Sequence, residues 1–319
     1  MNTLDPVVVF QQLHAKLAET VESALHGKRE VIELVLIAMF AGGHVLLEDV
    51  PGTGKTTLAR ALGQSFGGQT RRVQFTPDLL PADVTGTSVF NPADGSVQFR
   101  PGPVFTNVLL ADEINRAAAK TQSSLLEVME ERTVTVDGIT HSVPDPFLVV
   151  ATQNPIDMDG TYRLPEAQLD RFMVRVAIGY PDAEHEVNIL RPGSAAGSTG
   201  DLQPVTNPQQ AAQIAQSLRS VHVDDRILRY IRDIGQAARS DERLRLGAST
   251  RGLRALVRAV QVYAASQGRN FVVPGDVQFL AAPVLAHRMV LTREADLAGE
   301  SGDAITADLL NRLRVPQPA

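Results

Sequence analysis

The chain has 319 residues and a mass of 34.4 kDa, a length that suits about two domains. Its residues are 44% hydrophobic and 21% charged, close to the average for globular proteins, which excludes a disordered, collagen-like or coiled-coil chain. The absence of cysteine excludes disulfides, thiolate zinc sites and cysteine nucleophiles, and the formal net charge of −6 argues against nucleic acid as a partner.

The distribution of apolar residues predicts a protein without a membrane segment. The longest apolar run, residues 31–41, is interrupted by Glu33 and is too short for a bilayer, which needs about 20 residues. The first residues, from Met1 to Asp5, lack the basic start of a secretory signal. We therefore expect a soluble protein of the cytoplasm.

The first 66 residues predict two helices, a strand, a glycine-rich turn and a third helix. Residues 6–26 place apolar side chains at four-residue spacing, and a second helix is expected over 28–40. A short apolar strand at 44–48 leads into the glycine-rich turn, and residues 55–66 continue as a helix. Strand, glycine loop and helix in this order open a nucleotide-binding α/β sheet.

The next part of the chain predicts more strands of the same sheet. Continuous apolar runs, which are typical of buried parallel strands, occur at 108–111 and 147–151. A helix is expected over 118–130, and a hairpin over 133–143 turns at Asp137-Gly138. Together these elements predict an α/β domain with a parallel sheet. The other strands expected in this part are 72–75 and 171–179.

After residue 191 the pattern becomes helical. Small residues dominate 192–200, as is typical of a linker. The predicted organisation is therefore an α/β domain over residues 1–191, a linker over 192–202 and an all-helical domain over 203–319. The helices expected in this second domain are 211–218, 224–238, 251–266 and 274–286.

The strongest chemical signal is Gly52-Thr-Gly54-Lys55-Thr56, directly after the first strand. A triphosphate needs inward-facing backbone N–H groups, which glycines permit, a lysine for the β- and γ-phosphates, and a hydroxyl for Mg²⁺ at a helix start. Asp49 stands where the first glycine of the usual pattern would be, and Thr57 replaces the third glycine of a dinucleotide site. We therefore predict an ATP site. The residues expected to bind ATP are Asp49, Val50, Pro51, Gly52, Thr53, Gly54, Lys55, Thr56 and Thr57, with Thr56 also a Mg²⁺ ligand.

Two buried strands end in polar residues that suit ATP hydrolysis. Asp112, which follows the strand at 108–111, can hold Mg²⁺ through water, and the adjacent Glu113 can polarise the attacking water. Asn154 follows a later buried strand and would orient that water between the γ-phosphate and Glu113. The alternative for Asp112 and Glu113 is an ordinary strand end with solvated acids, and the alternative for Asn154 is a simple turn before Pro155. The phosphate loop upstream favours the functional interpretation.

Five ordered motifs, which span nearly the whole chain, resemble those of the MoxR family of AAA+ ATPases. Aspartate at the start of the phosphate loop is also common in that family. The motifs are Asp49-Val-Pro-Gly-Thr-Gly-Lys-Thr, Phe75-Thr-Pro-Asp-Leu-Leu-Pro-Ala-Asp-Val-Thr-Gly86, Arg100-Pro-Gly-Pro-Val-Phe105, Ala111-Asp-Glu-Ile-Asn-Arg-Ala117 and Leu164-Pro-Glu-Ala-Gln-Leu-Asp-Arg-Phe172. The resemblance implies an AAA+ core with a helix-2 insert around 83–101, a hairpin before sensor 1 and a C-terminal helical lid, with ATP bound between core and lid.

The resemblance also implies roles for single residues. Arg171 matches the arginine finger that reaches into a neighbouring subunit, with Arg116 and Arg163 as rivals. Arg171 could instead form a surface salt bridge with Asp170 or Glu166. The other matches are Lys55 and Thr56 in Walker A, Asp112 and Glu113 in Walker B, Asn154 as sensor 1, Arg251 as sensor 2 in the lid, and Gly27 in the adenine-side turn Leu25-His26-Gly27.

The function that the resemblance implies is an ATP- and Mg²⁺-dependent, chaperone-like remodeller that works as a homo-oligomeric ring of six subunits. Its client would be a protein, such as a von Willebrand A domain protein, that is matured or loaded with a metal. Three alternatives stay open: a nucleotide-dependent scaffold with negligible turnover, the ATPase subunit of a chelatase-type complex, and a DNA motor. The acidic charge disfavours the DNA motor. We also do not interpret the basic stripe of Arg251, Arg254 and Arg258 as a DNA site.

Overall fold

The computed structural model describes residues 5–50, 52–153, 164–181, 183–191 and 202–317. A five-stranded sheet lies at its centre, with the strand order β2-β5-β8-β1-β9 and every neighbouring pair parallel. This confirms the predicted α/β class. The strands are β1 (Val45–Glu48), β2 (Thr70–Gln74), β5 (Val108–Asp112), β8 (Leu148–Gln153) and β9 (Val174–Val176).

Alternate residues of these strands bury their side chains on opposite faces of the sheet, as the period of two requires. Val45 and Leu47 belong to one hydrophobic cluster with α1 (Pro6–Glu22), α2 (Arg29–Phe40) and α3 (Lys55–Ser65). Leu46 belongs to a second cluster on the other face, which includes residues of α5 (Ala119–Glu131). Because both faces are covered there, the inner strands β1, β5 and β8 read as nearly continuous apolar runs, whereas the edge strand β2 is mostly exposed.

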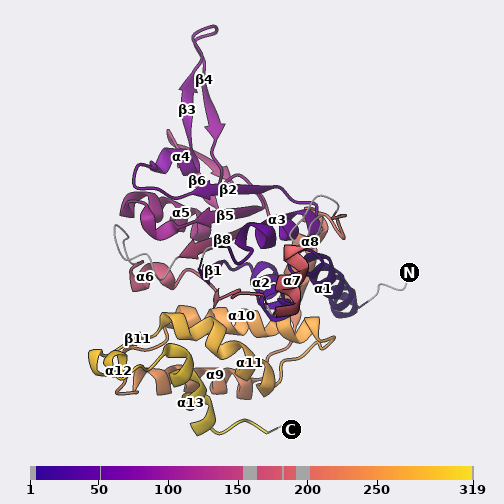
Figure 1. Cartoon of the computed structure of the whole chain (residues 1–319), viewed down its shortest axis with the longest axis vertical. Coiled ribbons are helices and arrows are strands. Elements are labelled where there is room, and N and C mark those ends of the chain that lie inside the picture. The colour runs from indigo at the N-terminus through magenta and orange to yellow at the C-terminus, as the bar shows by residue number, and fades with distance from the viewer. Residues whose placement is uncertain (1–4, 51, 154–163, 182, 192–201, 318–319) are drawn as a thin grey trace.

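Two antiparallel hairpins leave the core, as the family resemblance implied. After the short helix α4 (Pro81–Thr85), β3 (Gly86–Phe90) pairs with β4 (Val97–Pro101), and this hairpin projects far from the sheet (Figure 1). Gly86 is required at its base, because its φ is +97° and a Cβ there would lie 2.4 Å from the carbonyl oxygen of Arg100. The second hairpin joins β6 (Thr133–Val136) to β7 (Ile139–Ser142) through the predicted Asp137-Gly138 turn.

The C-terminal region forms a helical lid, which contains one feature that the sequence did not predict. Strand β10 (Leu244–Leu246) pairs with β11 (Val290–Leu291) in a short antiparallel ribbon, so the lid is not all helix. Strands of three and two residues are too short to show an alternating pattern. The lid helices are α8 (Pro208–Ser217), α9 (Asp225–Arg239), α10 (Thr250–Ser266), α11 (Pro274–Leu285), α12 (Arg293–Leu297) and α13 (Gly302–Arg312).

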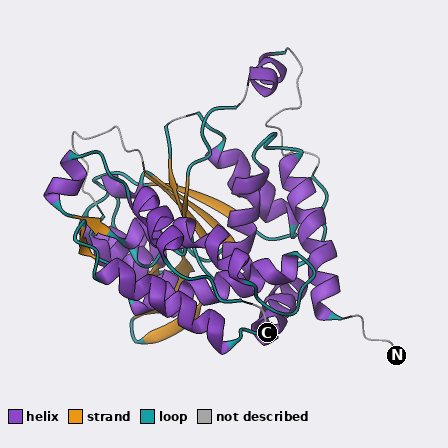
Figure 2. Cartoon of the chain, turned by 90° about the horizontal axis from the view of Figure 1, so that it is seen from below, coloured by secondary structure: helices purple, strands orange, loops and turns teal. Residues whose placement is uncertain are grey.

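The lid packs directly on the core domain. Helix α10 contacts α1 and α2, and the apolar residues of the lid continue the cluster on that face of the sheet. Seen from the lid side, helices lie in front of most of the strands (Figure 2). Helices α6 (Glu166–Leu169) and α7 (Ala183–Leu190) precede the lid in sequence. The predicted linker over 192–202 lies almost wholly outside the described residues, so the domain limits stay a prediction. Within the described segments, no helix is long and apolar enough to cross a membrane.

Candidate active site

The glycine-rich loop connects the end of β1 to the start of α3. Gly54 caps that helix with a φ of +94°, and Gly52 has a φ of +86°, so both take the left-handed conformation that glycine permits. A Cβ on Gly54 would lie 2.6 Å from Leu25 Cδ1. The loop therefore packs against the turn that contains Gly27, which also has a positive φ of +71°. Pro51 lies outside the described residues.

Asp49 uses its carboxylate to fix the start of this loop. Its Oδ1 accepts a hydrogen bond from the Val50 N–H at 2.9 Å, and its Oδ2 accepts from the N–H groups of Ile178 and Gly179, each at 2.8 Å. The carboxylate is buried. The Lys55 ammonium donates to the Asp49 backbone carbonyl at 2.8 Å. Asp49 thus ties the loop to the chain that leaves β9 and also orients the lysine.

The loop and the strand ends enclose a cavity of about 250 Å³ at the edge where the parallel strands end. The structure therefore brings Lys55 and Thr56 together with Asp112 and Glu113, as a parallel sheet requires. The lining residues among those described are Gly52, Gly54, Lys55, Thr56, Thr57, Arg72, Gln74, Asp112, Glu113 and Thr152. No lid residue is among these described lining residues, and the binding of ATP between core and lid stays a prediction.

Asp112 is held by two neighbouring strands. The Thr152 hydroxyl on β8 donates to Asp112 Oδ1 at 2.8 Å and accepts the Glu113 N–H at 2.9 Å. Arg72 on β2 binds Oδ2 through Nε at 2.8 Å and Nη2 at 2.6 Å. The Thr56 hydroxyl and the Asp112 carboxylate are hard oxygen donors in one cavity, which fits Mg²⁺. Arg72 and Mg²⁺ would compete for the same carboxylate.

Glu113 is restrained in a different way. Its backbone is left-handed, with φ 56° and ψ 47°, an uncommon conformation for a residue other than glycine. Its Oε2 accepts from Gln74 Nε2 at 2.6 Å and pairs with Arg116 Nη1 at 2.9 Å. Arg116, a rival for the arginine finger, therefore binds the Glu113 of its own chain. The carboxylate can polarise water only after these two contacts loosen.

Arg171 and Arg251 lie together at a second place. Arg171 Nε pairs with Glu130 Oε2 at 3.1 Å, and Arg251 Nη1 pairs with Glu130 Oε1 at 3.4 Å. The alternative salt bridge from Arg171 to Asp170 or Glu166 is not present among the described residues. Asp170 pairs instead with Arg288, and Glu166 pairs with Arg245. Both arginines line a cavity of about 770 Å³ between core and lid, which is lined by seven arginines and three carboxylates of the described chain.

Besides Pro51, two expected site residues are outside the described part of the chain. Asn154 directly follows the last residue of β8, Gln153, and Arg163 lies further along the same segment. Their predicted roles as sensor 1 and as a rival finger stay predictions.

Sequence reasoning missed three polar residues of the phosphate-loop cavity, namely Arg72, Gln74 and Thr152. A signal for two of them was present, since Arg72 and Gln74 alternate with the buried Val73 and Phe75 and so share one face of β2. Their partners, Asp112 at the end of β5 and Glu113 directly after it, are about 40 residues away in sequence, and only strand pairing brings them together.

The parallel sheet, the phosphate loop, the paired carboxylates and the helical lid define an AAA-type ATPase. A family model described as "ATPase family associated with various cellular activities (AAA)" matches residues 44–174, and an AAA lid domain model matches residues 236–309.

Relatives of similar length define the family more closely. The chain is 46% identical to an uncharacterised protein, YeaC, of Bacillus subtilis, covering 96% of this chain and 97% of that one. It is 39% identical to Chaperone MoxR1 of Mycobacterium tuberculosis (93% and 81%) and 34% identical to Protein MoxR of Paracoccus denitrificans (88% and 90%). The crystal structure of a candidate ATPase from Cytophaga hutchinsonii matches with a TM-score of 0.89 and 34% identity, covering 98% and 97%. The chain belongs to the MoxR family of AAA+ ATPases.

Proposed function

We propose that this protein hydrolyses ATP with Mg²⁺ and uses the energy to remodel a protein client as a ring of identical subunits. One observation carries the proposal: the phosphate loop, the Thr56 hydroxyl and the carboxylates of Asp112 and Glu113 line a single cavity. An anion site with hard oxygen donors and a carboxylate beside it is what phosphoryl transfer to water requires.

The residues in and around this cavity that the sequence predicted have the following proposed parts in the reaction. The backbone N–H groups around Gly52 and Gly54 and the Lys55 ammonium bind the β- and γ-phosphates, while Thr56 and Asp112 hold Mg²⁺. When bound, Mg²⁺ neutralises charge on the phosphate oxygens. Glu113 polarises the attacking water once Gln74 and Arg116 release it, and Asn154 orients that water. Asp49, Val50, Pro51, Thr53 and Thr57 complete the loop.

The position of Arg171 and Arg251 supports a shared active site. Both are paired with Glu130, and neither lines the phosphate-loop cavity of its own chain. A guanidinium at the γ-phosphate is worth roughly 10³–10⁵ in rate, so these two side chains become useful if they approach the nucleotide of a neighbour. We therefore propose that both act in trans in a homo-oligomeric ring, with six subunits as the expected number.

The two hairpins are the proposed contacts with the client. The β3–β4 hairpin exposes Phe90 and Val97, whose side chains are 61% and 65% exposed, and the β6–β7 hairpin exposes Ile139. Apolar side chains on projecting hairpins suit contact with another protein. The client that we propose is a protein, such as a von Willebrand A domain protein. The name Chaperone MoxR1 of a relative supports a chaperone-like role.

A mixing experiment tests the shared site. Glu113→Gln keeps its arginines but loses its own carboxylate, and Arg171→Ala keeps its carboxylate but loses its finger. Each variant alone should bind ATP and turn it over at least about a hundredfold more slowly than the wild type. Mixed, they should regain part of the activity, because an Arg171→Ala subunit then receives its finger from a Glu113→Gln neighbour.

Two controls complete that experiment. Arg245→Ala removes an arginine of the lid that is 69% exposed, and it should leave turnover unchanged. Specific activity of the wild type should also rise with protein concentration as the ring assembles. No recovery in the mixture would refute action in trans, and ATP binding without turnover at any concentration would favour the nucleotide-dependent scaffold instead.

A further inference from the structure

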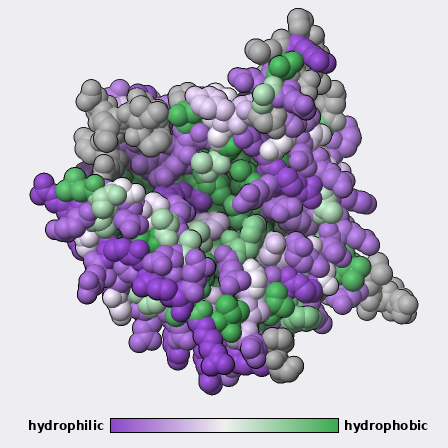
Figure 3. Space-filling model, turned by 60° about the horizontal axis from the view of Figure 1, so that its bottom comes forward, coloured by the Kyte–Doolittle hydropathy of each residue, from purple (hydrophilic) through white to green (hydrophobic). Residues whose placement is uncertain are grey.

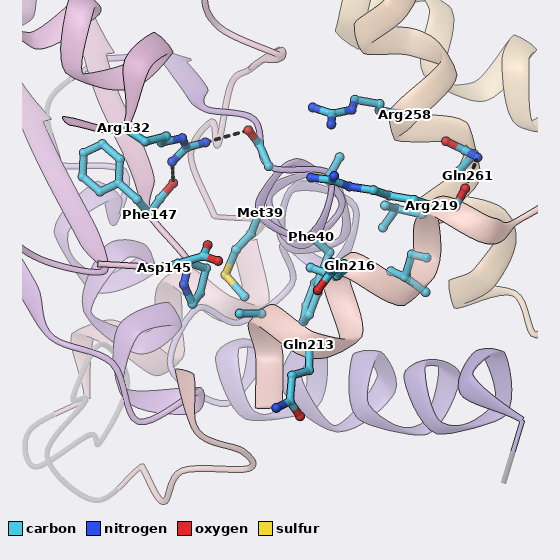
Figure 4. A pocket seen from close by; sticks show the side chains of 17 residues that line it. Met39, Phe40, Arg132, Asp145, Phe147, Gln213, Gln216, Arg219, Arg258 and Gln261 are labelled. Atoms are coloured by element: carbon cyan, nitrogen blue, oxygen red, sulfur yellow. Dashed lines mark hydrogen bonds between the residues drawn. The ribbon is translucent and has the colours of Figure 1, made fainter. Parts of the chain in front are cut away.

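A third cavity lies at the opposite edge of the sheet, where the parallel strands begin. Its volume is about 380 Å³. One side of the cavity is formed by residues that precede two strands, namely Gly42 before β1 and Pro146 and Phe147 before β8. The other side is formed by the lid, through α8, the short helix Leu218–Ser220 and α10 (Figure 4). The face of the molecule seen from the lid side has a hollow near its middle with hydrophobic surface inside and hydrophilic surface around it (Figure 3).

Three arginines converge on this cavity, and one of them is rigidly held. Arg132 donates through Nη2 to the Gly42 carbonyl at 2.7 Å and through Nη1 to the Phe147 carbonyl, and its guanidinium lies 5.4 Å from the centre of the Phe147 ring. Backbone carbonyls therefore orient this guanidinium but do not cancel its charge. It forms a fixed positive wall on the core side of the cavity.

The other two arginines come from the lid. Arg219 and Arg258 extend their guanidinium groups across the cavity toward Arg132 (Figure 4). Within the described part of the chain, neither guanidinium forms a hydrogen bond or an ion pair. Gln261 beside them binds the carbonyl of Val221 at 2.8 Å and so keeps the wall of the cavity in place.

The positive charge of the cavity is not balanced. Asp145 is the only carboxylate among the described lining residues, and it acts on Arg132. Burial lowers the pKa of Arg258, and the like charges of Arg219 and Arg254 lower it further. The pKa of Arg132 is likewise lowered by burial, against the attraction of Asp145. The positive charges of the cluster therefore repel one another, and a bound anion would offset this repulsion.

The cleft adjoins the cavity of the proposed finger site, because Arg132, Arg219 and Arg258 line both cavities. Arg251 and Arg258 are seven residues apart on α10, which corresponds to about 10 Å along the helix axis. Arg258 therefore lies about two turns of α10 away from Arg251, and the cleft extends the shared cavity away from the finger site. The remaining walls of the cavity are mostly apolar, with Met39, Phe40 and Leu218 among the lining side chains.

We propose that this cleft, defined by Arg132, Arg219 and Arg258, is a second anion site that binds an organic phosphate of nucleotide size. The planar donor forks of arginine match phosphate oxygens, the apolar walls suit the organic part, and the volume is in the range of small-molecule pockets. Core and lid each contribute to the site, so the bound phosphate fixes one against the other. The proposal does not depend on hydrolysis at the phosphate loop.

Calorimetry on the full chain tests the proposal in a background that weakens the phosphate loop, Lys55→Ala. The probes are ADP, pyrophosphate and inorganic phosphate. We expect one molar equivalent of ADP or pyrophosphate to bind, and the affinity to fall at least about tenfold in Arg219→Ala/Arg258→Ala. The matched control, Arg229→Ala/Arg232→Ala, removes two exposed arginines from α9 and should bind like its parent.

The same experiment has outcomes that would overturn the proposal. Equal affinity in Arg219→Ala/Arg258→Ala and its control would place the binding elsewhere, and no binding of any probe at millimolar concentration would remove the site. A hexaglutamate peptide that binds while the phosphates do not would assign the cleft to an acidic protein segment instead. Because neither arginine has a partner among the described residues, we expect the double variant to melt at or slightly above the parent's temperature, which separates lost binding from lost folding.

Discussion

Asp49 offers the most direct test of how the phosphate loop is held. In most loops of this kind the position is a glycine, yet here a buried carboxylate accepts three backbone N–H groups, from Val50, Ile178 and Gly179. Two of these donors belong to the chain that leaves β9, at the opposite side of β1 from Asp112 and Glu113. Replacing Asp49 should therefore weaken both the fold and the loop.

The size of the stability loss depends on which Asp49 oxygen accepts from which N–H group. Asp49→Ala leaves the buried Ile178 N–H and the Gly179 N–H without an acceptor, at about 1–3 kcal/mol each, and Gly179 can recover part through water. We expect a loss of about 3 kcal/mol in the free energy of unfolding. In Asp49→Asn, the side-chain oxygen can stay at the Oδ2 position and accept from the N–H groups of Ile178 and Gly179. The amide NH₂ then faces the Val50 N–H, which loses its acceptor, so the free energy of unfolding should fall by about 1–2 kcal/mol.

Urea unfolding followed by circular dichroism measures both losses, and the binding of a fluorescent ATP analogue measures the loop. Affinity should fall in the same order, since the Asp49 carbonyl also orients the Lys55 ammonium. Asp94→Ala, which removes an exposed carboxylate at the tip of the β3–β4 hairpin, is the control and should change neither quantity. Equal losses for the alanine and asparagine variants, or losses below about 0.5 kcal/mol for both, would refute this account of the loop.

Three further predictions concern other contacts. Arg72→Ala should lower the Mg²⁺ concentration for half-maximal nucleotide binding by at most about fivefold, because it frees Asp112 from an ion pair with a half-exposed partner; a higher Mg²⁺ requirement in a metal titration would contradict this. Arg288→Met should cost about 3–5 kcal/mol in urea unfolding, since the arginine side chain is 2% exposed and its carboxylate partner would stay unpaired; an unchanged midpoint would show that the pair is dispensable. Burial lowers the pKa of His14 to about 4 and that of His287 to about 3, so below pH 6.5 the unfolded chain takes up protons that the folded chain does not. Stability should therefore fall by about 2 kcal/mol per histidine between pH 6.5 and 5, and His14→Phe should remove its share of that slope in unfolding curves measured at both pH values.

The sequence predicts the fold well where a repeated local pattern exists. The apolar runs of β5 and β8, the glycine loop and the Asp137-Gly138 turn all appear at the expected positions. The ribbon of β10 and β11 was missed because two and three residues carry no period, and the helices after residue 286 were missed although Ser301 accepts a hydrogen bond from the Ala304 N–H as a helix cap. Pattern length therefore explains the missed ribbon but not the missed helix α13, which spans 11 residues.

The candidate site divides in a similar way. Motif spacing was sufficient to join Lys55 to Asp112, because all strands of a parallel sheet end at the same edge. It could not indicate that Arg72 reaches Asp112 from the edge strand, or that Glu130 holds both Arg171 and Arg251. Those contacts depend on strand order and on how the lid docks, and neither is written in local spacing.

One group of contacts links the docking of the lid to the proposed finger. Asp170 precedes Arg171 in sequence and accepts from Arg288 of the lid and from the Ser249 hydroxyl. The same Ser249 oxygen accepts the Gly252 N–H and so caps the helix that carries Arg251. The positions of both arginines are therefore fixed by one carboxylate between core and lid. In the proposed ring, any rotation of the lid against the core must move Arg251 relative to Arg171 or break the ion pair between Arg288 and Asp170. A change in the lid of one subunit would therefore alter hydrolysis in its neighbour.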